Sequence, residues 1–285
     1  MAELGTIVAK LSRLNQELGC KVELILTKAS LVYRVAKAQL QISLNNFYED
    51  FYQLIAIPLV GIAPIAVFIH AGRADLLSYA FVAIVTMTIG QMGLFTGSET
   101  IAMDKRFQVV DLIVSSPTSY FTLIVIRSLV FAILGSFSIV IAWFFIQIWF
   151  RETLVVHHPG LLFSSVLMTV LATAGLSTVT AALFSLARNV RTLQASINGP
   201  LYLLSGVLVP VAYLPAWVQL LAPGVFFYCS ASLIRDAFSP ETPVAVGLRL
   251  LWIGLSALVL FTLGAYLLRR MINILRREGT LSLTE

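Results

Sequence analysis

The fold is decided by long stretches without charge, such as residues 160–187, which read GLLFSSVLMTVLATAGLSTVTAALFSLA. A helix needs about 20 apolar residues to cross the hydrocarbon core of a bilayer. Five further runs of comparable length also contain no Asp, Glu, Lys or Arg: 51–72, 76–98, 128–150, 192–234 and 250–268. These runs predict an all-α integral membrane protein.

The composition agrees with this fold class. Hydrophobic residues make up 59% of the 285 residues and charged residues only 12%, against roughly a quarter charged in a soluble domain. So few polar side chains cannot cover a water-soluble core. We predict six transmembrane helices near residues 51–71, 76–97, 119–148, 160–187, 192–211 and 246–268. They form a six-span domain over residues 51–275, followed by a cytoplasmic tail over 276–285.

The basic residues predict the orientation. Of the 19 Lys and Arg residues, all but Arg73, Arg151, Arg235 and Arg249 fall on one side of this arrangement. Lys and Arg are enriched in cytoplasmic loops, so we expect both termini in the cytoplasm. The same anchoring explains the net charge of +5. The basic residues are scattered at membrane edges, which argues against nucleic acid as a partner.

The first fifty residues differ from the rest. Within residues 1–26, apolar side chains recur at heptad-like spacing, namely Leu4, Ile7, Leu11, Leu14 and Leu18. Residues 27–50 predict an amphipathic helix, with Arg34 and Lys37 on its polar face and Val35 on its apolar face. A basic amphipathic helix lies on the membrane surface or docks another subunit, and both roles are compatible.

The run 192–234 is too long for one helix and too short for a clean hairpin of two. Its breaks come from Gly206, Pro210, Pro215, Pro223 and Gly224. Irregular backbone at membrane depth survives only where protein or a water-filled cavity covers it. We therefore predict short re-entrant helices between the fifth and sixth spans, at the outer face.

Residues that carry chemistry are scarce. None of the five lysines follows a glycine, so the sequence has no phosphate-binding loop of the Gly-Lys-Ser/Thr type. No cysteine and histidine cluster has zinc-site spacing, and the predicted spans contain no acidic residue. Arg127 is the one charge well inside a span, and we interpret it as an anchor whose side chain reaches the interface. We expect neither a catalytic residue nor a bound metal or cofactor.

Neutral polar residues do occur within the spans. Hydrogen bonds between helices are their usual role in membranes, and we expect this role for most of them. Thr88 and Gln91 in the second span and Asn198 in the fifth could instead line a conduit. The sequence leaves these two interpretations open.

Two segments carry a family resemblance. Residues 98–120 read SETIAMDKRFQVVDLIVSSPTSY, and residues 204–219 read LSGVLVPVAYLPAWVQ. The first resembles the first cytoplasmic loop of type 2 ATP-binding-cassette (ABC) exporter permeases, in which a charged stretch leads into a short amphipathic helix. The second is similar to the Ser-Gly, Pro and Leu-Pro-x-Trp pattern of that family. The resemblance covers about residues 28–275.

The resemblance assigns two sets of residues. The coupling residues would contact the ATPase: Glu99, Asp104, Lys105, Arg106, Phe107, Val110, Asp111, Leu112 and Pro117. The gate residues would form an outer gate: Gly206, Pro210, Leu214, Pro215 and Trp217.

The resemblance also implies a function. It predicts a permease subunit, not itself an enzyme, with two ABC ATPase subunits that bind ATP and Mg²⁺ and a second permease chain, identical or homologous. The complex would export an amphiphilic drug-like, lipid or glycolipid substrate across the plasma membrane of a bacterium or archaeon. An intramembrane enzyme and a non-transporting scaffold or sensor remain the alternatives.

Overall fold

The computed structural model describes residues 30, 33–38, 41, 55–56, 59, 77–106, 120–150, 155–184 and 190–278, and it contains no strand among them. The chain divides into two compact units, Met1–Asn45 and Asn46–Glu285. In the first unit the described residues are helical, with Arg34 and Lys37 exposed and Val35 half-buried, as the amphipathic pattern predicts. The heptad-like series and most of the predicted first span lie outside the described residues.

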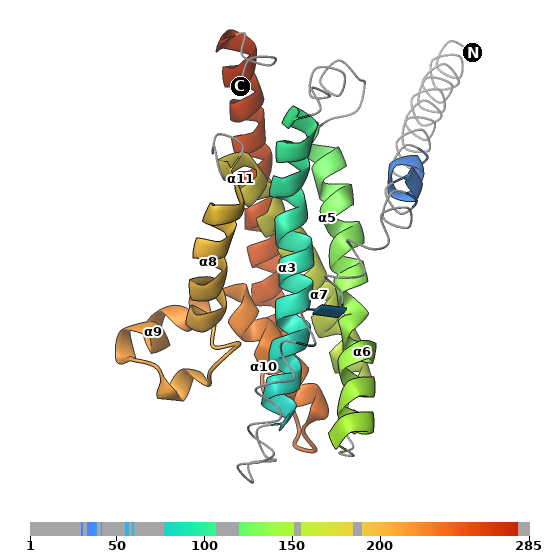
Figure 1. Cartoon of the computed structure of the whole chain (residues 1–285). Coiled ribbons are helices and arrows are strands. Elements are labelled where there is room, and N and C mark those ends of the chain that lie inside the picture. The colour runs from blue at the N-terminus through green and yellow to red at the C-terminus, as the bar shows by residue number, and fades with distance from the viewer. Residues whose placement is uncertain are drawn as a thin grey trace, which may run out of the picture. The chain divides into compact units, whose positions relative to one another are not determined.

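The described part of the second unit is a bundle of helices (Figure 1). Its elements, in chain order, are α3 (Leu77–Arg106), α5 (Tyr120–Ser136), α6 (Ser138–Phe145), the π-helical turn η2 (Ile146–Phe150), α7 (Pro159–Phe184), α8 (Val190–Leu204), the 3₁₀ turn η3 (Val211–Tyr213), α9 (Ala216–Leu221), the 3₁₀ turn η4 (Ala222–Gly224), α10 (Phe226–Phe238) and α11 (Val246–Glu278).

Four of these helices are long and apolar enough to cross a membrane. The spans are Leu77–Leu94 in α3, Tyr120–Ile148 in α5, α6 and η2, Pro159–Phe184, and Val246–Asn273. A fifth would be the pair Ala216–Gly224 and Phe226–Phe238, which is bent by 85°. The 15 residues of α8 extend only about 22 Å at 1.5 Å per residue, less than the hydrocarbon thickness of about 30 Å. The described residues therefore contain four or five candidate spans, and six stays a prediction.

The predicted second, third, fourth and sixth spans agree with the candidate spans of the structure to within a few residues. Three predicted helix ends are wrong, because two helices continue beyond their spans and one stops early. Because Gly97 alone does not end a helix rich in good helix formers, α3 runs on to Arg106. Residues 98–106 are therefore helix and not loop. The last helix continues past residue 268 to Glu278, through four arginines that favour helix and suit its C-terminus.

The third error concerns α8, which ends at Leu204 and not near residue 211. Gly206 adopts the left-handed conformation, with φ at 65°. The amide of Val207 donates to the Tyr202 carbonyl, and the amide of Gly206 donates to the Leu203 carbonyl. This pair of bonds is a Schellman motif, which satisfies the last carbonyls and stops the helix.

The core of the bundle forms around α7, which contacts α3, α5, α10 and α11. Phe81 of α3 packs edge-on against Phe238 of α10, with ring centroids 5.1 Å apart. The most extensive pairing joins α7 to α11. At its closest point a Cβ on Gly264 would lie 1.9 Å from Thr178 Oγ1, so only glycine fits there.

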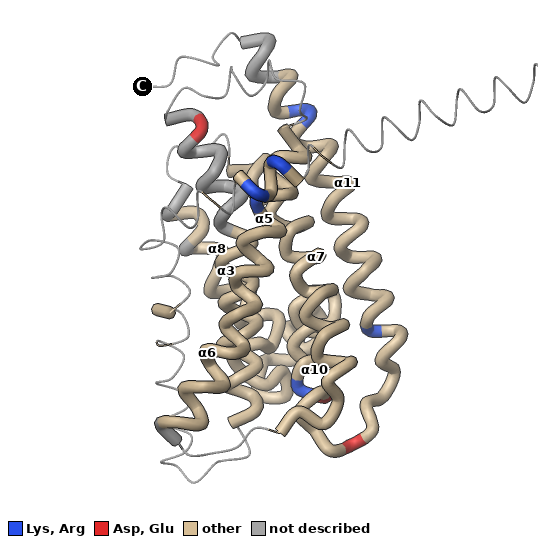
Figure 2. The backbone as a smooth tube through the Cα atoms, turned by 90° about the vertical axis from the view of Figure 1, so that its right-hand side faces the viewer, with Lys and Arg blue, Asp and Glu red and all other residues tan. Residues whose placement is uncertain are grey.

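The outer helices present apolar side chains. Leu251, Leu258 and Tyr266 of α11 are each more than 60% exposed. Figure 2 shows the described charged residues toward the two ends of the helices, with long uncharged stretches between them. An exposed apolar face bounded by charged ends is what a helix in contact with lipid requires.

Candidate functional site

The structure describes four of the coupling residues. Glu99, Asp104, Lys105 and Arg106 all lie in the final turns of α3 and not in a loop. The remaining coupling residues, Phe107, Val110, Asp111, Leu112 and Pro117, fall outside the described residues. The segment 107–119 thus begins where α3 ends and finishes where α5 begins.

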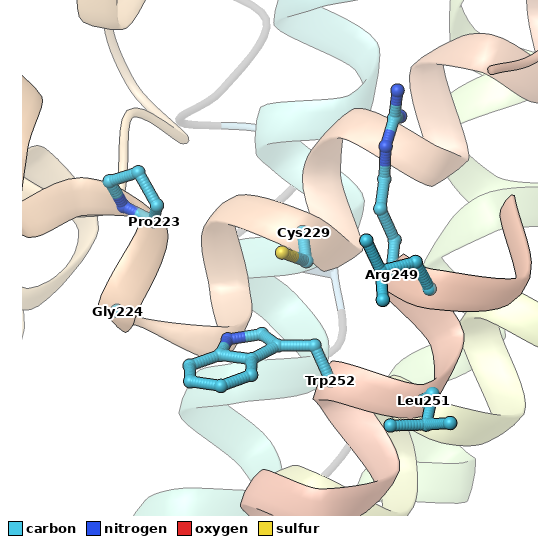
Figure 3. Close-up of a pocket in the computed structure, with 7 residues that line it drawn as sticks. Pro223, Gly224, Cys229, Arg249, Leu251 and Trp252 are labelled. Atoms are coloured by element: carbon cyan, nitrogen blue, oxygen red, sulfur yellow. The ribbon is translucent and has the colours of Figure 1, made fainter. Parts of the chain in front are cut away.

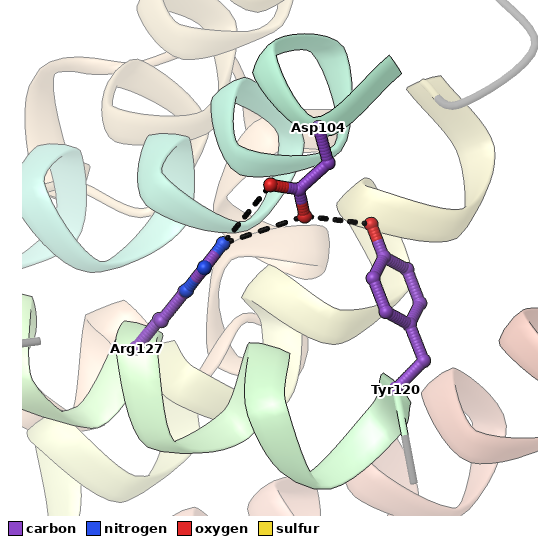
Figure 4. A network of polar contacts seen from close by, with 3 residues as sticks. All are labelled: Asp104, Tyr120 and Arg127. Atoms are coloured by element: carbon purple, nitrogen blue, oxygen red, sulfur yellow. Dashed lines mark hydrogen bonds and ion pairs between the residues drawn. The ribbon is translucent and has the colours of Figure 1, made fainter. Parts of the chain in front are cut away.

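A polar network joins these two helix ends. The Arg127 guanidinium of α5 lies 3.4 Å from Asp104 Oδ2 of α3, and Tyr120 donates its hydroxyl proton to the same oxygen at 3.2 Å (Figure 4). The Asp104 and Arg127 side chains are only 12% and 20% exposed. A pair so largely removed from solvent is weakly screened, so it holds the two helices together.

The sequence does not predict this network, because Arg127 is interpreted there as an anchor whose side chain reaches the interface. A lone charge inside a span usually has a partner, which was the available signal. A loop position for Asp104 would not predict this pairing. Because α3 extends to Arg106, Asp104 is instead a buried residue of the helix, within reach of Arg127.

The gate residues lie at the breaks between short elements. Pro210 precedes η3 and Leu214 follows it, while Pro215 precedes α9. Trp217 projects from α9 with 61% of its surface exposed. Among these residues Gly206 is the one that must be glycine, since a Cβ there would lie 2.1 Å from Val211 Cγ2.

We expect Gly206→Ala to destabilise the protein by about 2 kcal/mol, because alanine resists the left-handed conformation and its Cβ would overlap Val211. Thermal unfolding of the purified protein in detergent measures this loss. Gly224→Ala is the matched control, since a Cβ on Gly224 meets nothing within 4 Å. Equal unfolding temperatures for the two variants would contradict the steric requirement for glycine at position 206.

A second polar cluster connects Gly206 to the N-terminal end of α3. The Tyr79 hydroxyl donates to the Gly206 carbonyl at 2.5 Å. The Arg235 guanidinium of α10 stacks over the Tyr79 ring at 4.0 Å, a cation–π contact that is stronger where water is excluded. The buried Nε of Arg235 has no hydrogen-bond acceptor among the described residues. Tyr79 therefore binds both the end of α8 and the end of α10, and no sequence pattern indicated this.

Beside that cluster, Asp236 pairs with Arg249 of α11 at 2.6 Å. The loop before α7 is attached to the same region, because His157 Nδ1 lies 3.1 Å from the Phe238 carbonyl. No group of three or more His, Cys, Asp or Glu residues able to hold a metal ion occurs in the described part of the chain.

The three conduit candidates have different surroundings. Thr88 is fully buried and donates to the Ile84 carbonyl of its own helix at 2.8 Å. Gln91 and Asn198 are half-buried on α3 and α8. The buried Oδ1 of Asn198 has no hydrogen-bond donor among the described residues. These two helices meet where the Tyr202 hydroxyl donates to the Met87 carbonyl at 3.4 Å.

Comparison with known proteins gives one family. Residues 31–238 match the family model described as ABC-2 type transporter, which is well over half of the chain. No curated protein matches the sequence significantly. The matched region includes the polar contacts of α3 and the gate residues. The chain therefore belongs to the ABC-2 type transporter family, as a multi-pass membrane permease subunit that associates with an ABC ATPase.

Proposed function

We propose that this permease belongs to an ATP-driven exporter that moves an amphiphilic drug-like, lipid or glycolipid substrate out of the cytoplasm or inner leaflet. Two ATPase subunits bind ATP and Mg²⁺, and a second permease chain, identical or homologous, completes the transporter. Residues 51–275 form its six-span domain in the plasma membrane of a bacterium or archaeon. Both termini lie in the cytoplasm.

The observation that carries this proposal is the pair of polar clusters at opposite ends of α3. Tyr79 contacts Gly206 and Arg235 near one end, and Asp104 contacts Tyr120 and Arg127 near the other. The 30-residue helix is about 45 Å long, so it extends across a whole bilayer. A displacement at one cluster is therefore transmitted along a rigid helix to the other.

In this mechanism ATP binding closes the two ATPase subunits and moves segment 107–119. The Asp104 and Arg127 pair ties α3 to α5 on either side of that segment, so both helices follow. At the far end, the motion of Tyr79 acts on the chain reversal at Gly206 and on α10 through Arg235. Switching between inward-facing and outward-facing access requires packed helices that have two stable arrangements. The breaks at the gate residues supply the hinges between these arrangements.

The proposed cargo follows from the chemistry of the spans. Charged side chains lie toward the helix ends, while α3 and α8 carry the half-buried amides of Gln91 and Asn198. Neutral amides in an otherwise apolar setting suit an amphiphile better than an ion, because they cannot compensate for the free-energy cost of removing an ion from water. We assign these two residues to the transport pathway.

The coupling assignment is tested by Phe107→Asp combined with Val110→Asp. We expect about a tenfold or greater loss of the ATPase subunit that copurifies with the tagged permease, because a carboxylate in an apolar contact is costly to bury. Export of a fluorescent phospholipid analogue from cells or vesicles should fall in parallel. Ser115→Asp combined with Ser116→Asp is the matched control, since it adds the same charge to the same segment without removing an apolar side chain.

Three results would overturn the proposal. Unchanged copurification and export in the double variant would remove the coupling role from segment 107–119. A native complex purified without any ATPase subunit would favour a scaffold or sensor, and turnover of a lipid by the permease alone would favour an intramembrane enzyme.

A further inference from the structure

A cavity of about 520 Å³ lies between η4, the start of α10 and the first two turns of α11. Its lining residues are Pro223, Gly224, Cys229, Leu248, Arg249, Leu251 and Trp252. Figure 3 shows the Cys229 thiol and the Trp252 ring pointing into the space beside Pro223 and Gly224. This volume is typical of a site for a small molecule or a lipid chain.

The rim of the cavity is exposed and apolar. Leu248 and Leu251 are 71% and 64% exposed, and both lie in the membrane span of α11. Apart from Arg249, the lining side chains are apolar or weakly polar. Water gains few hydrogen bonds in such a space, whereas an acyl chain fills it favourably.

Arg249 provides the polar end of the site. One guanidinium nitrogen of Arg249 donates to Asp236 at 2.6 Å, and the side chain remains 29% exposed. A guanidinium has five N–H donors in a planar fork, so donors remain for a phosphate. Arg249 lies within the first turn of α11, which begins at Val246, and Trp252 lies one turn further into the span. Arg and Trp at a helix end mark the level of the lipid headgroups.

We propose that this cavity binds one acyl chain of a bilayer glycerophospholipid, with the lipid phosphate held by the Arg249 guanidinium. The chain passes along Trp252 and Cys229 and fills the angle between α10 and α11. The site requires only that α11 spans a membrane, so it does not depend on the proposed direction of transport or on its cargo.

The test uses Trp252 as the reporter. In a variant with Trp143, Trp149 and Trp217 replaced by phenylalanine, the protein is placed in nanodiscs containing a rising fraction of phosphatidylglycerol brominated on its acyl chains. We expect Trp252 to reach half-maximal quenching at about a tenfold lower fraction of brominated lipid than a lipid-facing tryptophan outside the cavity. A tenfold difference in affinity is what one hydrogen bond to a charged group produces. Leu255→Trp in a Trp252→Phe background provides that reference, since Leu255 is 48% exposed one turn further along.

Variants then separate the chain site from the phosphate site. Gly224→Phe places a ring in the cavity and should remove the preferential quenching, whereas Gly254→Phe should retain it. A Cβ on either glycine meets nothing within 4 Å, so both variants should fold, and thermal unfolding checks this. Arg249→Gln should raise the half-quenching fraction about tenfold. Asp236→Asn, which breaks the same ion pair but keeps the guanidinium, should not.

Three results would overturn the proposal. Equal quenching profiles for the tryptophans at 252 and 255 would mean ordinary contact with bulk lipid. Retained preferential quenching in Gly224→Phe would place the lipid elsewhere. Equal quenching by brominated diacylglycerol, unaffected by Arg249→Gln, would remove the phosphate contact.

Discussion

The Asp104→Ala variant is expected to reach the membrane and bind its ATPase subunit, but to hydrolyse ATP with little export. The substitution removes the ion pair to Arg127 and the hydrogen bond from Tyr120. Hydrogen bonds to charged groups contribute about 1.5–3 kcal/mol each. Partial exposure of this pair and its long 3.4 Å distance favour the lower end of that range. Loss of about 3 kcal/mol at the joint between α3 and α5, about 1.5 kcal/mol for each contact, lets segment 107–119 move without the helices, which we expect to lower export at least tenfold.

The measurement compares ATP hydrolysis and export of a fluorescent phospholipid analogue by the same reconstituted complex. Arg127→Ala should have a similar effect, and the double variant should be little worse than either single one, because the two residues act through one contact. Exchanging the charges, with Asp104→Arg and Arg127→Asp together, should restore part of the export. Tyr120→Phe should have a smaller effect. Export that falls in strict proportion to ATP hydrolysis would contradict a role in coupling.

The Gly264→Ala variant is expected to lose about 3 kcal/mol of stability, which corresponds to a fall of roughly 10 °C in Tm. The added Cβ would lie 1.9 Å from Thr178 Oγ1, 2.7 Å from its Cβ and 3.1 Å from its backbone carbon. Rotation of the threonine side chain relieves only the first contact, because Cβ and the carbonyl carbon are fixed by the backbone, so α7 and α11 must separate. This is the most extensive helix pairing in the described structure, and Gly264→Leu should prevent the protein from accumulating in the membrane.

Gly254→Ala is the matched control for this prediction. Gly254 lies on the same helix, and its Cβ would meet nothing within 4 Å. Alanine favours helix over glycine by about 1 kcal/mol, so the control should be unchanged or slightly more stable. The two glycine variants should therefore move Tm in opposite directions. Similar decreases in both would show that helix packing at Thr178 is not the cause.

Much of the fold could be predicted from uncharged length alone. The absence of charge from residues 160–187 located α7, because lipid contact requires a continuous apolar helix. Helix ends could not be predicted in this way. Charged residues end a membrane span but do not end a helix, as the C-terminal ends of α3 and α11 show. The end of α8 depends on the conformation of Gly206, which local sequence permits but does not require.

The candidate site was harder to predict than the fold. The sequence located the breaks at the gate residues, because proline and glycine act locally. Contacts such as Tyr79 with Gly206, which are 127 positions apart in the chain, depend on how the helices pack. The Asp104 and Arg127 pair was missed for the same reason. A long-range polar contact leaves no periodic pattern in a single sequence.

The hydroxyl groups of α7 have a further consequence for movement. We predicted that most polar groups in the spans would join helices, yet Thr169 and Thr173 each donate at 2.7 Å to a carbonyl one turn earlier in α7. Thr178 likewise donates to Gly175, whereas Ser177 contacts Ser128 of α5 at 2.7 Å. A hydroxyl that bonds within its own helix keeps its partner when that helix slides past its neighbours. Shear of α7 against α11 therefore costs mainly side-chain repacking. Sliding past α5 and α3 is resisted where Ser177 pairs with Ser128 and where Ser177 and Thr180 contact the Leu94 carbonyl of α3 at 3.4 and 3.5 Å.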